Sequence, residues 1–235
     1  MQDDLAMREI RLEWRLIFLY AMGLVAFSVV YTMALWLMPG ADDSLTFAAY
    51  GQLIYYAILA TLMVRVAYRP LKTMLAKHRM QKGYTLGVII GGFFFMLGTS
   101  TLVGIVLSEF GITDTSANQE SLEQMAQSAW YNFVAVGLFG VLFAPIIEEL
   151  VFRKGVFGLM ERRWNATAAI LGSSLLFGAI HMMTGFSHVL ELLPYVAMGV
   201  AFGVIYKLTD RRLDIVIGMH MLWNLFVVSV MLIGM

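Results

Sequence analysis

Long apolar stretches alternate with short polar connections along the chain, and this pattern predicts a bundle of membrane-spanning helices. A helix needs about 20 apolar residues to cross the ~30 Å hydrocarbon core of a bilayer. Seven stretches are close to that length, namely 14–38, 46–67, 85–107, 131–151, 166–183, 188–207 and 213–234. We therefore expect an all-α polytopic membrane protein with about seven transmembrane helices, forming a single integral membrane domain over residues 1–235.

The composition agrees with that pattern and removes several classes of function. The 235 residues are 60% hydrophobic and 14% charged, whereas soluble domains carry about 25% charged residues. The formal net charge of +0 gives no support to nucleic-acid binding, and the count of 0 cysteines excludes disulfides and thiolate chemistry. The 18 methionines suit the filling of gaps between helices better than metal binding.

Charges in the connections alternate between basic and acidic. The basic groups are Arg8 to Arg15, Arg65 to Lys82, Arg153 to Arg163 and Lys207 to Arg212. The acidic groups are Asp42 with Asp43, and the stretch 108–130 with Glu109, Asp114, Glu120 and Glu123. The positive-inside rule then places the N-terminus in the cytoplasm and the C-terminus outside. We expect a bacterial cytoplasmic membrane protein that contacts lipid, with 14–38 as an uncleaved first helix.

A few ionisable side chains interrupt the apolar segments, and such residues are functional candidates by default. Glu149 and Arg153 stand four residues apart and share a helix face, which predicts an ion pair. Glu148 points about 100° away from Glu149 and needs another partner. The other candidates are His181, with Phe177 one turn before it as a wall against the imidazole, and His220, with Asn224 one turn after it.

Helix length indicates where Glu148 finds its partner. A turn near Trp164 and Asn165 would join two antiparallel helices. Glu148 lies 16 residues before this turn and His181 lies 16 residues after it, so both stand about 24 Å from it at ~1.5 Å per residue. The two side chains can therefore face each other. This register forces 182–188 to cross membrane depth as irregular backbone, which is tolerated only inside protein or beside water.

These side chains permit a hydrolase that activates water. Glu148 would act as general base with His181 orienting the water, and His220 with Asn224 would donate hydrogen bonds to the developing oxyanion. This chemistry needs no cofactor. An alternative uses Glu148, His181 and His220 as three zinc ligands. His78 and His188 are expected to lie in connections and to take no part.

Three short motifs resemble those of the CPBP family, which comprises Rce1-type CAAX prenyl proteases and bacteriocin-processing, Abi-type relatives. They are "EELVFR" (148–153), "FGAIH" (177–181) and "HMLWN" (220–224), within a CPBP-like core over about 115–230. The resemblance implies an intramembrane glutamic endopeptidase. It gives Glu148, His181, His220 and Asn224 catalytic roles and Glu149 and Arg153 supporting roles. Lys154 departs from the glycine that many relatives carry there, which would affect the cavity mouth or substrate preference.

Other interpretations remain at this stage. Taken singly, each polar residue could be a structural hydrogen-bond partner between helices. A non-catalytic immunity or scaffold protein could use the same fold, and a proton-coupled transporter could use Glu148 and His181 as a relay. One active site accounts for all four residues and their order, so we expect a protease with a cavity open to the cytoplasm. Its partner would be a peptide or membrane-protein substrate.

Overall fold

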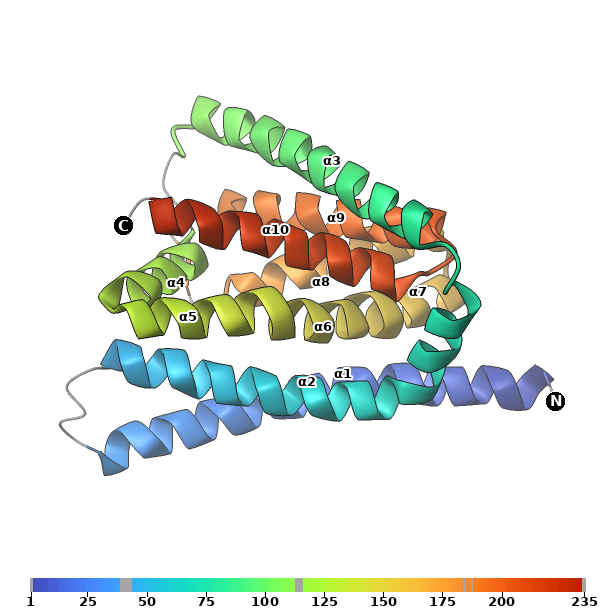
Figure 1. Cartoon of the computed structure of the whole chain (residues 1–235), viewed down its shortest axis with the longest axis horizontal. Coiled ribbons are helices and arrows are strands. Elements are labelled where there is room, and N and C mark those ends of the chain that lie inside the picture. Colours follow the sequence, from blue (N-terminus) through green and yellow to red (C-terminus); the bar gives the residue numbers. More distant parts are fainter. Residues whose placement is uncertain (1, 39–43, 113–115, 184, 187, 234–235) are drawn as a thin grey trace.

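The computed structural model describes residues 2–38, 44–112, 116–183, 185–186 and 188–233, and within these ranges the chain is helical without strands (Figure 1). The predicted acidic residues Asp42, Asp43 and Asp114 lie outside the described residues. The helices are α1 (Gln2–Leu37), α2 (Ser44–Lys77), α3 (Lys82–Glu109), α4 (Ala117–Ser128), α5 (Trp130–Leu138), α6 (Ala144–Glu149), α7 (Gly158–Arg163), α8 (Ala166–His181), α9 (Leu192–Leu208) and α10 (Leu213–Ile233). Two π-helical segments, η1 (Phe139–Phe143) and η2 (Leu150–Phe157), and the 3₁₀ turn η3 (Val189–Glu191) complete them.

The prediction of an all-α polytopic protein is confirmed, and each of the seven predicted segments falls on a helix. Six helices in the described residues are long and apolar enough to cross a membrane, and the 16-residue α8 is shorter. Large apolar side chains such as Phe18 and Trp36 face outward on these helices. Exposed apolar surface of this extent indicates a membrane environment.

Two stretches between the predicted segments are also helical. α4 occupies the acidic stretch 108–130, which we expected to be a connection. Its N-cap, Ser116, accepts a hydrogen bond from the Gln119 amide at 3.3 Å, which is half of an S-x-x-Q capping box. α2 continues through Pro70 to Lys77, and its last part bends away from the rest of the helix (Figure 1), as expected where a proline ring replaces an amide hydrogen.

The centre of the bundle is one continuous rod from Trp130 to Arg163, formed by α5, η1, α6, η2 and α7. It contacts α1 and α2 on one side and α8 and α10 on the other, and α9 packs on α8 and α3 (Figure 1). The rod carries the motif "EELVFR" at its middle, so residues from several neighbouring helices can reach this motif.

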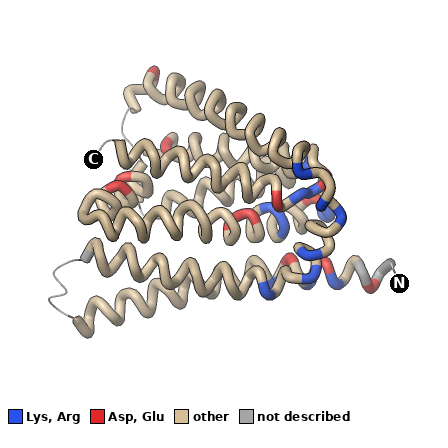
Figure 2. The backbone as a smooth tube through the Cα atoms, in the orientation of Figure 1, with Lys and Arg blue, Asp and Glu red and all other residues tan. Residues whose placement is uncertain are grey.

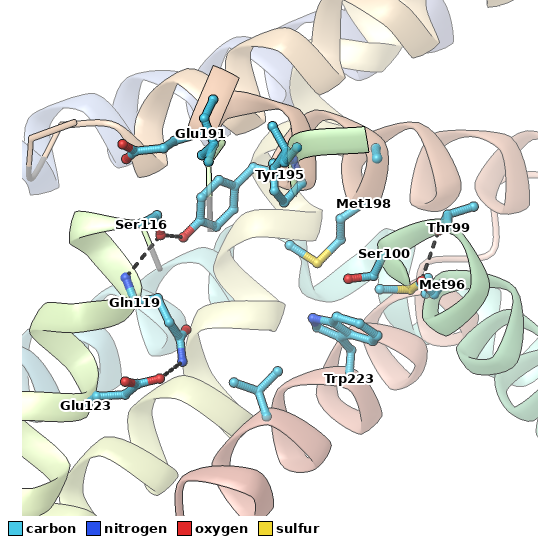
Figure 3. A pocket seen from close by; sticks show the side chains of 15 residues that line it. Met96, Thr99, Ser100, Ser116, Gln119, Glu123, Glu191, Tyr195, Met198 and Trp223 are labelled. Carbon is cyan, nitrogen blue, oxygen red and sulfur yellow. Dashed lines mark hydrogen bonds between the residues drawn. The ribbon is translucent and has the colours of Figure 1, made fainter. Parts of the chain in front are cut away.

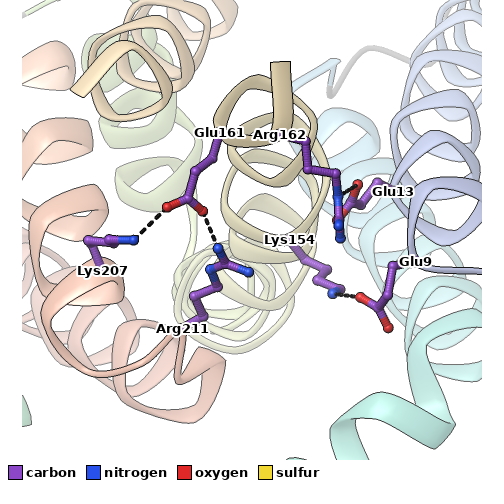
Figure 4. Close-up of polar contacts among 7 residues, drawn as sticks. All are labelled: Glu9, Glu13, Lys154, Glu161, Arg162, Lys207 and Arg211. Carbon is purple, nitrogen blue, oxygen red and sulfur yellow. Dashed lines mark hydrogen bonds and ion pairs between the residues drawn. The ribbon is translucent and has the colours of Figure 1, made fainter. Parts of the chain in front are cut away.

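Lys and Arg gather at the end of the bundle where the N-terminus lies, and the opposite end carries acidic residues without Lys or Arg among those described (Figure 2). Ion pairs at the basic end join the rod to its neighbours (Figure 4). Glu161 binds Lys207 and Arg211, and Glu13 of α1 binds Arg162. Lys154 pairs with Glu9. Lys154 thus attaches α1 to the rod.

α8 and α9 approach each other closely because small residues line their contact. A Cβ added at Gly199 would lie 2.9 Å from the Cα of Ser174, and one at Gly178 would lie 2.8 Å from side-chain atoms of Leu192 and Val196. The first neighbour is backbone and cannot rotate away. α8 and α9 would have to separate to admit even one methyl group at Gly199.

We therefore expect Gly199→Ala to lower thermal stability. Overpacking typically costs about 1–3 kcal/mol, which exceeds the gain of about 0.5–1 kcal/mol from replacing a helical glycine by alanine. Gly98→Ala is the matched control, because an added Cβ there meets nothing within 4 Å. Melting of purified protein in detergent, followed by intrinsic fluorescence, measures both. A melting temperature for Gly199→Ala equal to or above that of Gly98→Ala would contradict this packing.

Candidate active site

The two glutamates of the first motif lie on a single α-helical turn and a half between two π segments. Pro145 is the second residue of this stretch and has no amide hydrogen to donate to the preceding turn. The helix widens just before it, and the Ala144 amide bonds the Phe139 carbonyl, five residues back. Such π turns inside α-helices often mark functional sites. Here they flank α6 on both sides and set the directions of Glu148 and Glu149.

Glu149 and Arg153 form the predicted ion pair, and the pair is fully buried. Arg153 Nε donates to Glu149 Oε2 at 3.1 Å, and both side chains are 0% exposed. Arg153 Nη1 donates to the Ser173 hydroxyl on α8 at 3.0 Å. The pair also has a third connection, because Glu149 Oε1 lies 3.0 Å from Nδ1 of His220 on α10. Glu149 thus holds both the arginine and one of the candidate catalytic histidines.

Glu148 faces both histidines. Its Oε2 atom lies 3.9 Å from His181 Nε2 and 3.8 Å from His220 Nε2, so the predicted pairing of Glu148 with His181 across the hairpin is confirmed. We expected the neighbouring glutamates to serve different partners, yet His220 contacts both of them. These separations exceed a direct hydrogen bond but suit groups that share a water molecule. Glu148 is 7% exposed, and its Oε2 has no hydrogen-bond partner among the described residues.

The Nδ1 partners of the histidines indicate how the rings are protonated. His181 Nδ1 lies 2.7 Å from the Phe177 carbonyl, which can only accept, and His220 Nδ1 meets the Glu149 carboxylate. Each Nδ1 therefore carries the hydrogen, and each neutral ring presents Nε2 as an acceptor. Glu148 Oε2 and the two Nε2 atoms are thus three acceptors that face one another. They can be linked only through hydrogens that another group supplies. A water molecule or a protonated imidazole supplies those hydrogens.

Aromatic rings enclose this group. Phe177 lies 4.7 Å from the His181 ring and 5.9 Å from the His220 ring, centroid to centroid, which agrees with its predicted role as a wall. Phe202 stacks on His220 at 4.6 Å. The Arg153 guanidinium lies over both phenylalanine rings, at 5.6 and 5.8 Å. These rings exclude water from the ion pair and stabilise the cation.

Glu148, His181, His220 and Asn224 all line one cavity of about 330 Å³, which is the size of a small ligand site. We expected it to open toward the basic end. Its walls include Asn118, Gln119 and Leu122 of α4, so it extends toward the acidic end instead. Toward the basic end, the ion-paired Arg153 and its aromatic neighbours fill the space.

Asn224 reaches the site with part of its amide engaged. Its Nδ2 donates to the Gly140 carbonyl in η1 at 2.8 Å, which leaves one of its two amide hydrogens for another acceptor. The two remaining histidines lie elsewhere. His188 caps η3 by accepting from the Leu190 amide, and His78 Nδ1 lies 2.8 Å from Gln81 Oε1 in the turn after α2.

Sequence reasoning missed three contributors to the site. Ser173 binds Arg153, and the Gly140 carbonyl receives Asn224. Tyr195 of α9 stacks on His181, with centroids 4.4 Å apart and planes inclined by 19°. Only Ser173 had a signal, as a buried hydroxyl two turns before His181. The other two depend on a π turn and on the packing of α9, which residue spacing does not reveal.

The zinc alternative finds suitable donors but no assembled set. Two imidazoles whose Nδ1 atoms are held by a carboxylate and a carbonyl are typical of zinc ligands. Among the residues that the structure describes, however, no group of three His, Asp or Glu side chains is arranged to hold a metal ion.

Comparison with known proteins gives a consistent result. The family model described as type II CAAX prenyl endopeptidase, Rce1-like, matches residues 130–226. The chain is 31% identical over 195 residues to the membrane-embedded CAAX protease MroQ of Staphylococcus aureus (strain USA300), covering 79% of this chain and 74% of MroQ. This chain belongs to the Rce1-like CAAX endopeptidase family, the CPBP family.

Other relatives of this CPBP protein are also bacterial. It is 30% identical over 179 residues to the candidate membrane peptidase YdiL of Bacillus subtilis (strain 168), over 76% of this chain and 69% of YdiL. It is 29% identical over 140 residues to the UPF0177 protein YvdC of Lactococcus lactis subsp. lactis (strain IL1403), over 59% and 50%. No solved structure matches the chain. The protein is a multi-pass membrane protease, and the matched region contains all three motifs.

The different surroundings of the two glutamates predict opposite effects on stability. Glu149→Gln removes the counter-charge of a fully buried arginine, and breaking a buried pair in this way costs about 3–5 kcal/mol. Glu148→Gln removes a carboxylate whose Oε2 has no hydrogen-bond partner among the described residues, so it should leave the melting temperature unchanged or raised. Thermal unfolding of both variants in one detergent makes the comparison. A melting temperature for Glu149→Gln equal to that of Glu148→Gln would refute this assignment.

Proposed function

We propose that the protein is an intramembrane endopeptidase that hydrolyses a peptide bond with water activated by Glu148 and His181. The observation that supports this most is the convergence of His181 Nε2 and His220 Nε2 on Glu148 Oε2 at 3.9 and 3.8 Å, inside a cavity. The carboxylate of Glu148 beside the imidazole acceptor of His181 is suited to bind and deprotonate water. No nucleophilic side chain is needed.

The proposed reaction starts with a water molecule between Glu148 and His181. Glu148 takes a proton from the water, while His181 Nε2 accepts a hydrogen bond from the second hydrogen and orients the molecule. The water oxygen forms a bond to the substrate carbonyl carbon, and the carbonyl π electrons move to its oxygen to give a tetrahedral oxyanion. When the C–N bond breaks, the electrons of the oxyanion restore the carbonyl. The leaving nitrogen takes the proton from Glu148, giving an amine and a carboxylic acid.

His220 and Asn224 are proposed to stabilise the oxyanion. Neutral His220 cannot donate from Nε2, because its hydrogen lies on Nδ1 toward Glu149. A protonated His220 can donate, and its charge makes the buried set of Glu148, Glu149, Arg153 and His220 neutral overall. Such balance matters because uncompensated charge is costly in an apolar environment. Asn224 adds the amide hydrogen that Gly140 does not use.

The substrate is proposed to be an apolar peptide or a membrane protein. One relative, MroQ, is named a CAAX protease, so a prenylated peptide is one member of the class to be tested. We also propose that the basic end of the bundle lies in the cytoplasm. The cavity then extends into the outer half of the membrane, and the substrate reaches Glu148 from that half.

Peptide hydrolysis by purified protein tests the catalytic proposal. The probe is a panel of internally quenched peptides that contains unmodified apolar sequences and a farnesylated peptide ending in CAAX. We expect Glu148→Gln and His181→Ala to reduce kcat by about 10²–10⁴, the usual contribution of general base catalysis. We expect Asn224→Ala to reduce kcat by about 10²–10³, as does the loss of an oxyanion-hole donor.

Glu120→Gln is the matched control, because Glu120 is exposed on α4 and lies outside the cavity lining. It removes the same charge and should retain full activity. Retained cleavage by both Glu148→Gln and His181→Ala would refute the site. The same assay with a strong chelator, followed by zinc repletion, separates the two chemistries. Loss on chelation and recovery with zinc would replace the glutamate mechanism by the metal alternative.

The orientation proposal is tested by cysteine labelling, since the natural chain has no cysteine. Met80→Cys lies at the basic end, where the side chain is 91% exposed, and Gln124→Cys lies on the exposed face of α4. An impermeant maleimide applied to intact spheroplasts should label Gln124→Cys, and should label Met80→Cys only after lysis. The reverse pattern would invert the topology.

A further inference from the structure

Tyr195, on the first turn of α9, joins the candidate active site to the acidic end of the bundle. Its ring is stacked on His181 at 4.4 Å and 19°. Its hydroxyl shares a 2.6 Å hydrogen bond with the Ser116 hydroxyl and accepts a longer one, 3.4 Å, from Asn118 Nδ2. Ser116 is the N-cap of α4 and also accepts from the Gln119 amide. A continuous set of contacts therefore runs from α4 through Tyr195 to His181.

The same tyrosine forms part of a wall between two cavities. A second cavity of about 380 Å³ lies between α3, α4, α9 and α10 (Figure 3). Tyr195, Met198 and Trp223 line both this cavity and the one that contains Glu148. The Tyr195 ring lies between these two open volumes and packs against the hydrophobic core. Of the two hydrogen bonds at its hydroxyl, the one to Ser116 is the shorter, at 2.6 Å.

His181 needs such a support because its own contacts leave the ring free to tilt. The bond from Nδ1 to the Phe177 carbonyl fixes where that edge of the ring points, but it permits the ring to tilt about this direction. Phe177 lies on the ring at 46°, an inclined contact, whereas Tyr195 lies nearly parallel to it. A parallel neighbour opposes tilting. The distance from Nε2 to Glu148 Oε2 depends on that tilt.

We propose that Tyr195 is a positioning residue for His181, and that the Ser116 hydroxyl at the start of α4 fixes Tyr195 in turn. The stack keeps the imidazole in the plane that directs Nε2 toward Glu148. The hydrogen bond to Ser116 makes this alignment depend on the seating of α4. The inference rests on the proposed role of His181 as the group that orients the attacking water.

Variants of Tyr195 separate the ring from the hydroxyl. We expect Tyr195→Leu, which removes the stack, to lower kcat about 10–100-fold with KM within threefold, because misplacing a catalytic group by about 1 Å can cost 10²-fold. Tyr195→Phe keeps the ring and should lose less than fivefold. Ser116→Ala should match Tyr195→Phe in kcat, and the double variant should be no worse than either, because each single variant already removes the bond between Ser116 and Tyr195. The probe is the quenched peptide that wild-type protein cleaves fastest.

A readout that needs no substrate uses diethyl pyrocarbonate, with each histidine quantified by mass spectrometry. Tyr195→Leu should raise the modification rate of His181 several-fold. The rate at His78, which is partly exposed in the turn after α2 and lies outside the site, serves as the internal reference. Tyr206→Leu is the matched control, because Tyr206 is a buried ring on the same helix that packs on Phe157 and lines neither cavity. It should lower stability but leave kcat and the His181 rate unchanged.

Two outcomes would overturn the proposal. One is an unchanged His181 modification rate in Tyr195→Leu. The other is a further fall in activity when Tyr195→Leu is added to His181→Ala, because a residue that acts through His181 should have no effect once the imidazole is gone. If His181→Ala itself keeps full activity, the proposed function fails. The modification rates then still decide whether Tyr195 holds the ring.

Discussion

A fully buried arginine determines how the centre of this protein is assembled. Arg153 lies near the middle of the rod at 0% exposure, where an unpaired cation would be strongly unfavourable. Its compensation comes from three helices: Glu149 on the rod, Ser173 on α8, and, through Glu149, His220 on α10. Phe177 and Phe202 cover the guanidinium. Satisfying one charge thus fixes the relative positions of the three helices that carry the motifs.

The catalytic proposal depends on this arrangement. Because Glu149 engages Nδ1 of His220, the opposite nitrogen is turned toward Glu148. On the other side, the Phe177 carbonyl engages Nδ1 of His181, so that its Nε2 is also turned toward Glu148. Glu148 itself has few restraints. A site in which the reactive carboxylate is left poorly satisfied while its neighbours are held firmly is a common way to reconcile stability with activity.

Much of the candidate site could be predicted from the spacing of residues along single helices. The Glu149–Arg153 pair follows from four-residue separation, and the Glu148–His181 pair follows from equal distances to the turn at Trp164 and Asn165. Contacts between distant segments could not be obtained in this way. The contact of His220 with Glu149 depends on π turns that alter helical register around α6. The stacking of Tyr195 on His181 depends on glycines that bring α9 against α8. The helix α4 had a local signal, its Ser116 cap, but its acidic composition favoured a connection.

The early end of α8 affects the surrounding lipid as well as the site. At ~1.5 Å per residue its 16 residues span about 24 Å, less than the ~30 Å hydrocarbon core. The chain that follows includes exposed Met183, which lines the cavity, and exposed Phe186. Backbone without regular hydrogen bonding draws water to that depth, and the bilayer adapts to a short segment by thinning locally. Glu148 would then lie closer to the interface than its place in the rod suggests. A substrate's peptide bond could reach it without first being buried at the midplane.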